Sequence, residues 1–333
     1  MRRTLAALPP ARLGPRALIF MLPTLVAEVP CGPGWLFEIK WDGVRVLALR
    51  RRGRVELRSR AGRDVTAQYP EVAAAVAGLP GGDLALDGEI VVPDAHGRPS
   101  FHALQRRMHA SRAVAALARA CPVVTYVYDC LALEGCDLRG LPLRERKARL
   151  RALLGRGGTL RYADHVEGDG GAFFAEACAA GLEGVVAKRA EAPYRGGRRR
   201  EWLKVKCQLR QEFVLGGWTD PKGTRAHLGA VHLGVYEDGA LAYVGRAGSG
   251  LDTAALGALH TCLVRLATER CPFVRGTPPR GREHHWVRPE LVCEVRFSEW
   301  TPDGRLRHPV FLGLRTDKRP RDVHREAPVR PRA

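Results

Sequence analysis

A lysine at the end of a run of strand-forming residues, directly before a tight turn, is the first candidate for chemistry. Residues 35–40 are typical of a strand that ends at Lys40, and Asp42-Gly43 is a strong turn signal. A strand would fix the lysine amine at the rim of a sheet, where an amine without its proton can attack phosphorus. Only seven of the 54 basic residues are lysine, so a retained lysine can mark a place where arginine could not serve as nucleophile.

Two further lysines, Lys204 and Lys206, alternate in a strand-like segment and therefore point to one face. Together they could hold a phosphate and activate a neighbouring amine. The alternative is a solvated edge strand on which lysine prevents unwanted pairing. We expect Lys147 and Lys222 to be ordinary surface residues.

Carboxylates occur in two short apolar contexts, Asp87-Gly88-Glu89 and the segment from Glu183 to Lys188. Each carboxylate alone could be a simple turn residue. Near a phosphate-binding lysine cluster they suit Mg²⁺, which takes one or two carboxylates together with waters and phosphate oxygens.

The elements that must position these residues divide the chain into two parts. Residues 17–211 mix short strands with helices and predict an α+β domain of antiparallel sheets. Residues 212–318 carry about five strands and one helix, which fits an OB-fold β-barrel. Residues 1–16 are predicted to be a variable basic leader, and residues 319–333 a basic flexible tail.

Net charge of +19 favours a polyanionic partner, with nucleic acid the first candidate and an anionic membrane surface the second. No apolar run approaches the roughly 20 residues of a membrane span, and we expect a cytoplasmic, nucleoid-associated protein. Nine cysteines show no CxxC pair or zinc spacing, which predicts reduced thiols.

The chemical residues lie in motifs that resemble, in order, those of the covalent nucleotidyltransferases: ATP-dependent DNA ligases, RNA ligases and mRNA capping enzymes. The nucleophile motif is Lys40-Trp41-Asp42-Gly43-Val44-Arg45. The other motifs are Ser59-Arg60-Ala61-Gly62-Arg63-Asp64, Leu86-Asp87-Gly88-Glu89, Tyr126-Val127-Tyr128-Asp129, Glu183-Gly184-Val185-Val186-Ala187-Lys188, Trp202-Leu203-Lys204-Val205-Lys206, and the segment from Arg307 to Lys318. The chain is most similar to ligases of the bacterial ligase D type. Cys130 departs from the usual aliphatic residue, and Met21-Leu22-Pro23 matches the segment before the nucleophile only partly.

This resemblance implies a nucleotidyltransferase domain (ATP-grasp-like DNA ligase fold) followed by an OB-fold, using ATP and Mg²⁺ or Mn²⁺. In that family the lysine at the place of Lys40 carries AMP. The resemblance assigns the remaining roles as follows: adenine stacking to Tyr128 and its edge to Glu38, ribose to Arg45 and Glu89, phosphate to Arg60, Lys204 and Lys206, cofactor binding to Lys188, metal to Glu89 and Glu183, and pyrophosphate orientation to Arg315 and Lys318.

The implied reaction is the sealing of 5′-phosphate/3′-hydroxyl nicks in double-stranded DNA through lysyl-AMP, in nonhomologous end joining. The implied partners are nicked or broken DNA, bacterial Ku and a separate repair polymerase, and we expect a monomer. An RNA ligase or another polynucleotide nucleotidyltransferase remains the rival enzyme. An inactive nucleic-acid-binding scaffold is the alternative from another class.

Overall fold

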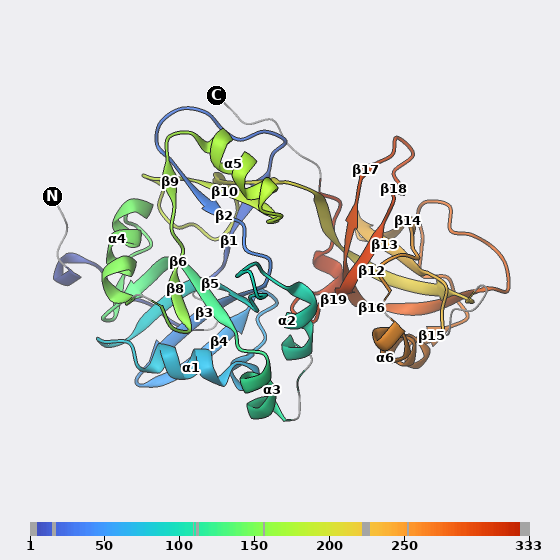
Figure 1. The fold of residues 1–333 in the computed structure, drawn as a ribbon, viewed down its shortest axis with the longest axis horizontal. Helices are drawn as coiled ribbons and strands as arrows, with labels where there is room; N and C mark the ends of the chain where they lie inside the picture. The colour runs from blue at the N-terminus through green and yellow to red at the C-terminus, as the bar shows by residue number, and fades with distance from the viewer. Residues whose placement is uncertain are drawn as a thin grey trace. The chain divides into compact units, whose positions relative to one another are not determined.

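The computed structural model describes residues 5–14, 18–108, 110, 113–155, 157–221, 227–251 and 253–326. Lys222, expected at the surface, lies outside these residues. The chain folds as two compact units, one within Met1–Cys207 and one within Gln208–Glu326 (Figure 1). Among the described residues, no helix is both long and apolar enough to cross a membrane.

The first unit contains two sheets, mainly antiparallel. Five strands form one sheet in the order β1 (Met21–Leu25), β11 (Gly197–Lys206), β10 (Gly184–Arg189), β2 (Trp35–Ile39) and β9 (Val166–Glu167). The other has the order β4 (Arg54–Ser59), β3 (Val44–Arg51), β5 (Leu84–Val91), β6 (Val124–Leu133) and β7 (Cys136–Asp137), with β8 (Leu160–Tyr162) beside β6. The helices are α1 (Pro70–Ala77), α2 (Phe101–Met108), α3 (Val114–Ala120), α4 (Leu143–Leu153) and α5 (Gly170–Ala179).

Alternation along the five-stranded sheet separates an apolar face from a polar face. Phe37, Ala187 and Leu203 are neighbours in register, so their side chains share one face and pack with Ala177 of α5. The adjacent positions on the same strands point the other way and carry charged residues. Burial of the apolar face fixes the strand register, and this register aligns the charged residues on the polar face.

The six-stranded sheet divides in the same way. Val46, Leu57 and Val127 belong to a large buried cluster that includes Val72 of α1 and Leu104 of α2. Figure 1 shows α1 running along this sheet beside β3 and β4. The opposite face of the sheet carries Arg45 and Glu89 together with a smaller buried cluster that includes Leu47, Leu49 and Tyr128.

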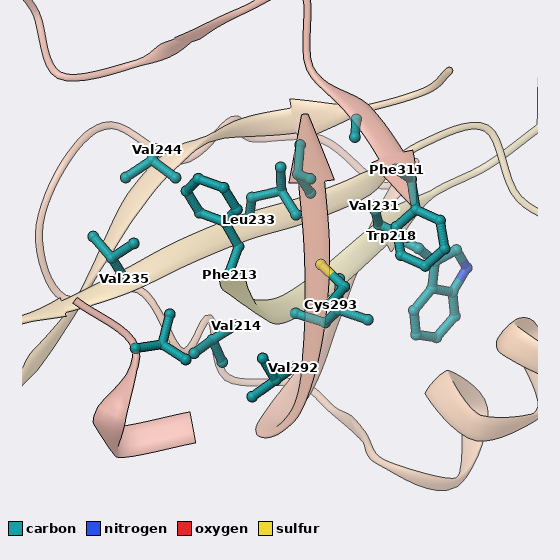
Figure 2. Close-up of a cluster of buried hydrophobic side chains, with 14 of the residues drawn as sticks. Phe213, Val214, Trp218, Val231, Leu233, Val235, Val244, Val292, Cys293 and Phe311 are labelled. Atoms are coloured by element: carbon teal, nitrogen blue, oxygen red, sulfur yellow. The ribbon is translucent and has the colours of Figure 1, made fainter. Parts of the chain in front are cut away.

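The second unit is a curled half-barrel sheet consistent with the predicted OB-fold. Its strand order is β14 (Ala240–Ala247), β13 (Val231–Glu237), β12 (Leu209–Thr219), β16 (His284–Phe297) and β15 (Ala267–Thr268), and β19 (Val310–Leu314) pairs with β16. A separate hairpin joins β17 (Glu299–Trp300) to β18 (Leu306–Arg307), and α6 is Thr253–Arg265. Phe213, Leu233, Val235 and Val244 gather in its core (Figure 2).

Described residues of both predicted terminal segments are held against the two units. Leu13 of the predicted leader is buried, and the Ala11 N–H donates to the Gly135 carbonyl at 2.7 Å. At the other end, Val323 is buried in the second core, and its carbonyl accepts a hydrogen bond from Tyr236 at 2.8 Å. The second unit thus includes residues 319–326, and it begins at Gln208, whereas the predicted division lies after residue 211.

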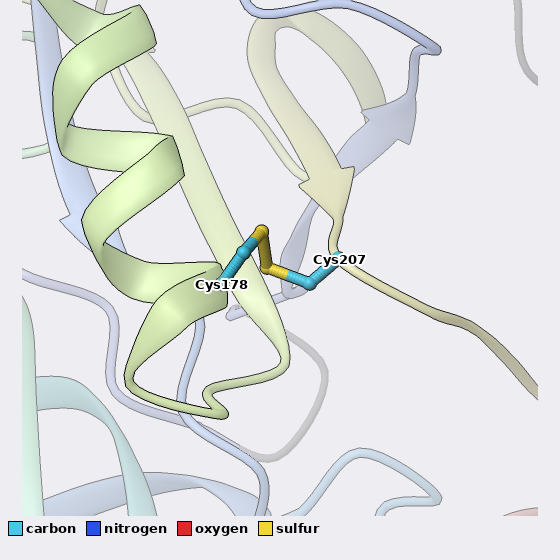
Figure 3. Close-up of a disulfide and its surroundings, with 2 residues drawn as sticks. All are labelled: Cys178 and Cys207. Atoms are coloured by element: carbon cyan, nitrogen blue, oxygen red, sulfur yellow. A yellow bond between two sulfur atoms is a disulfide. The ribbon is translucent and has the colours of Figure 1, made fainter.

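The prediction that all cysteines are reduced is wrong for two of them. Cys178, near the end of α5, and Cys207, directly after β11, form a disulfide with a Cα–Cα distance of 5.3 Å (Figure 3). Sequence spacing could not reveal this pair, because 29 positions separate the two cysteines and only the fold brings them together.

Candidate active site

Lys40 lies directly after β2, held by both backbone and side chain. Its N–H donates to the Gly184 carbonyl at 2.9 Å, and its ammonium forms an ion pair with Glu183. A side chain at Gly43 would put Cβ 2.1 Å from the Ile90 carbonyl oxygen. Gly184 has φ of +148°, and a Cβ there would lie 2.0 Å from the Val205 carbonyl oxygen. These two glycines let the chain pass close enough to set the lysine beside its carboxylate.

The polar face of the five-stranded sheet continues from this ion pair. Glu38, Val186 and Lys204 are direct neighbours across β2, β10 and β11, so their side chains stand in one row. Lys188 and Lys206 lie two positions along their strands and therefore share this face. The structure brings together four of the predicted site residues on this face, and it excludes the edge-strand alternative for Lys204, which is buried in a strand that lies between β1 and β10.

A second row crosses the six-stranded sheet. Arg45 of β3 is in register with Glu89 of β5, which is in register with Tyr126 of β6. The Arg45 guanidinium donates to both oxygens of the buried Asp87, at 3.0 and 2.7 Å, and Tyr194 donates its hydroxyl to the same carboxylate at 2.7 Å. Such a bidentate pair fixes the plane of the guanidinium.

The polar faces of the two sheets meet. Arg45 lies 5.6 Å from the Trp202 ring, and Tyr128 packs edge-on against Trp202 with centroids 6.1 Å apart. Lys188 approaches both aromatic rings, with its Nζ 4.2 Å from each centroid. The predicted residues of both sheets therefore line one polar and aromatic interior.

The two tyrosines of β6 differ in what covers them. Tyr128, which the resemblance assigned to adenine, is buried and has the Lys188 ammonium over its ring. Tyr126 is half-exposed and stacks on Trp41, with centroids 3.5 Å apart and planes 4° from parallel. The Tyr126 ring, which lies in the row formed with Arg45 and Glu89, is therefore already stacked on the Trp41 ring. The sequence could have indicated that Tyr126 lies beside Tyr128, because the two tyrosines are two positions apart on one strand and so share a face.

The expectation that Lys147 is a surface residue is wrong. Its side chain is 1% exposed, and its ammonium donates to Glu38 Oε1 at 2.6 Å, while Lys188 donates to Glu38 Oε2 at 2.7 Å. Burial alone would raise the pKa of Glu38, but the two lysines outweigh it and the pKa lies below its usual range. Burial lowers the pKa of Lys188 to about 8 despite its ion pair with Glu38.

The remaining predicted residues of the first unit are Arg60 and Glu89. Arg60 is half-buried in the turn after β4, and Glu89 is half-exposed in β5. Within the described part of the chain, no group of three or more His, Cys, Asp or Glu side chains could hold a metal ion. The Glu183 and Glu89 carboxylates still fit Mg²⁺, which needs only one or two protein carboxylates when phosphate oxygens complete its shell.

The second unit holds Arg315 and Lys318 in ion pairs of its own. Arg315 is buried and donates to both oxygens of Asp317 at 2.8 Å and to Glu294 at 2.7 Å. Lys318 pairs with Glu212 at 2.8 Å. Burial with two carboxylates gives Arg315 a structural role in its own unit, which its motif did not indicate.

Comparisons with known proteins identify the family of this chain. The family model "ATP dependent DNA ligase domain" matches residues 25–206, and "ATP dependent DNA ligase C terminal region" matches residues 224–318. The multifunctional non-homologous end joining protein LigD of Pseudomonas aeruginosa is 42% identical over 316 residues, which are 93% of this chain and 37% of that protein. A probable DNA ligase of Streptomyces coelicolor is 37% identical, covering 86% of this chain and 57% of the relative.

Among solved structures, a mycobacterial DNA ligase D complexed with ATP and MES has a TM-score of 0.63 and 37% identity, covering 92% of this chain and 98% of that one. The chain spans little more than a third of the length of the LigD relatives. With both family models in chain order and the lysine and carboxylate motifs assembled in one interior, the chain belongs to the ATP-dependent DNA ligase family.

Proposed function

We propose that this chain is an ATP-dependent DNA ligase that seals 5′-phosphate/3′-hydroxyl nicks through a covalent lysyl-AMP. The observation that carries the proposal is the ion pair between Lys40 and Glu183 at the edge of a face that also bears Lys204 and Lys206. This arrangement places one nucleophilic amine beside a carboxylate and beside two cations suited to phosphate.

In the first step, the Lys40 amine attacks the α-phosphorus of ATP. An N–P bond forms as the bond to the bridging oxygen breaks, and pyrophosphate leaves. Glu183 accepts a hydrogen bond from Lys40 Nζ, so it is placed to receive the proton that the amine releases. Lys204 and Lys206 balance the charge that develops on the α-phosphate.

A divalent ion would be held by Glu183, with Glu89 as a second carboxylate. When bound, it neutralises charge on the phosphate oxygens. Arg45 and Glu89 bind the ribose, and their register across β3 and β5 sets the spacing between them. In the later steps AMP passes to a 5′-phosphate held by Arg60, and the 3′-hydroxyl then displaces AMP.

The covalent step is tested by incubating the chain with α-labelled ATP and Mg²⁺ or Mn²⁺ and separating it on a denaturing gel. The wild-type chain should be labelled, and Lys40→Ala should not. Lys40→Arg should fail as well, because the guanidinium stays protonated and cannot attack. Label that persists in Lys40→Ala refutes the proposed nucleophile.

The polynucleotide is tested with matched nicked duplexes of DNA and RNA. We propose nicked DNA as the substrate, supported by the net charge of +19 and by the family to which the chain belongs. Faster sealing of the nicked RNA duplex would favour the RNA-ligase alternative. We place the enzyme in nonhomologous end joining, with Ku and a repair polymerase as partners, and assays on broken ends with and without Ku test that placement.

A further inference from the structure

The buried lysine Lys147 is a feature that the motifs do not explain. It lies on α4, and besides Glu38 it donates to the Ala163 carbonyl at 2.8 Å. Its ammonium also lies 4.6 Å from the centroid of the Tyr162 ring. Burying an ammonium is costly unless it is fully partnered, so these contacts hold Lys147 in one place.

Lys188 contacts the same carboxylate from a different environment. It reaches Glu38 Oε2 from β10 and rests between the rings of Tyr128 and Trp202. Lys147 is anchored by a backbone carbonyl, whereas Lys188 lies within the polar interior between the sheets. Lys147 is therefore the fixed support of Glu38, and Lys188 is its partner within the polar interior between the sheets.

The hydrogen-bonding capacity of Glu38 decides what this support is for. An ionised carboxylate has about four acceptor positions and no donor. The two lysines use two of these positions, which leaves room for a ligand that donates. The exocyclic amine of a 6-aminopurine donates a hydrogen bond, whereas the oxygen of a 6-oxopurine accepts one and would face another acceptor.

We propose that Lys147 is a positioning residue that keeps Glu38 ionised and oriented, and thereby sets the preference for a 6-aminopurine over a 6-oxopurine nucleotide. This inference rests on the proposed function and on the base-edge contact that the family resemblance assigns to Glu38. If Glu38 took up a proton it would become a donor, and the discrimination against the 6-oxo group would weaken.

Charge supports this reading. Two lysines surround one carboxylate, so the buried cluster carries a surplus positive charge that opposes protonation of Glu38. The titratable groups that face Lys147 are Tyr162 and His165, and the pKa of His165 is lowered by burial and by this lysine. The cluster thus disfavours any further proton near Glu38.

The test measures single-turnover labelling of Lys40 with ATP and with GTP between pH 5.5 and 8. In Lys147→Met the KM for ATP should rise about tenfold, the loss expected for one charged hydrogen bond, with a smaller change in the saturated rate. The ratio of ATP to GTP labelling should fall. The KM for ATP should also rise as the pH falls, because Glu38 without Lys147 takes up a proton more readily. Lys147→Arg keeps the charge and should restore the wild-type pH profile.

Arg146→Met is the matched control, since Arg146 precedes Lys147 on α4 and forms a buried pair with Asp129. It should lower stability without changing base preference or the pH profile. Should Lys147→Met not fold, Glu38→Gln supplies the second measurement, because it must lower the ATP to GTP ratio by itself. Wild-type base preference and pH profile in Lys147→Met, or an unchanged ratio in Glu38→Gln, would overturn the inference. Absence of labelling in the wild-type chain would instead refute the proposed function.

Discussion

Replacing Arg315 with methionine tests whether this residue holds the second unit together. Arg315, Asp317 and Glu294 are all buried, and the arginine bonds to both carboxylates. Removing one partner of a buried ion pair leaves uncompensated charge and costs about 3–5 kcal/mol. Arg307→Met is the control, because Arg307 pairs with Glu299 where both side chains are more than half exposed, and such pairs are worth about 0–1 kcal/mol.

The assay is urea unfolding at pH 7, with hydrogen exchange to follow the second unit separately. The difference between wild type and Arg315→Met should narrow as the pH falls. In the wild type, the pKa of Asp317 is raised by burial but lowered more strongly by Arg315, so the stability it adds is lost as the pH falls through that depressed pKa. In the variant, protonation of Asp317 removes the unpaired charge and restores stability.

A double variant sharpens the test. Arg315→Met with Asp317→Leu removes one stranded carboxylate and should recover much of the lost stability. Equal stability of Arg315→Met and Arg307→Met would refute the structural role. If Arg315→Met kept full stability but lost Lys40 labelling, the result would instead favour the role in pyrophosphate orientation that the motif implied.

Three further outcomes follow from the site. Tyr128→Ala should raise the KM for ATP about tenfold, since the resemblance assigns adenine stacking to Tyr128 and aromatic stacking of a base is worth about 1–3 kcal/mol, whereas Tyr128→Phe should match the wild type. Between pH 8 and 9 the stability of the wild type relative to Lys188→Met should rise by about 1 kcal/mol, because the folded lysine, with a pKa of about 8, releases a proton that the unfolded lysine keeps. An unchanged difference contradicts that pKa. Reduction of the Cys178–Cys207 disulfide should lower the melting temperature, because the disulfide adds about 3–4 kcal/mol to the free energy of unfolding through chain entropy. The melting temperature of the Cys178→Ser, Cys207→Ser double variant should not change when reductant is added.

Local patterns predicted the strands and helices well where burial alternates. The chain bends at Gly43, between β2 and β3, where the sequence indicated a break between two strands, and Lys204 and Lys206 share a face as their spacing required. Membership in the ligase family is likewise confirmed. Several motifs in the family's order identify the family, although each motif alone is a weak indication. These features depend on neighbours close in sequence or on the order of short segments.

Features that depend on distant contacts could not be predicted. The partner of Lys147 lies 109 positions away, so helical composition alone suggested a solvated residue. The strand β1 was missed because it pairs with β11, about 175 positions later in the chain. The burial of Arg315 follows from Glu294 on a different strand, and a motif confined to residues 307–318 does not include it.

The disulfide has a topological consequence. Glu183, Lys188, Lys204 and Lys206 all lie between Cys178 and Cys207, so the oxidised chain encloses them in a single covalent ring. A protease cut at any one bond inside that ring leaves the two fragments joined, and they separate on a gel only after reduction. The ring also limits how far these four side chains can move apart when the first unit unfolds, so they stay close to one another in the unfolded chain.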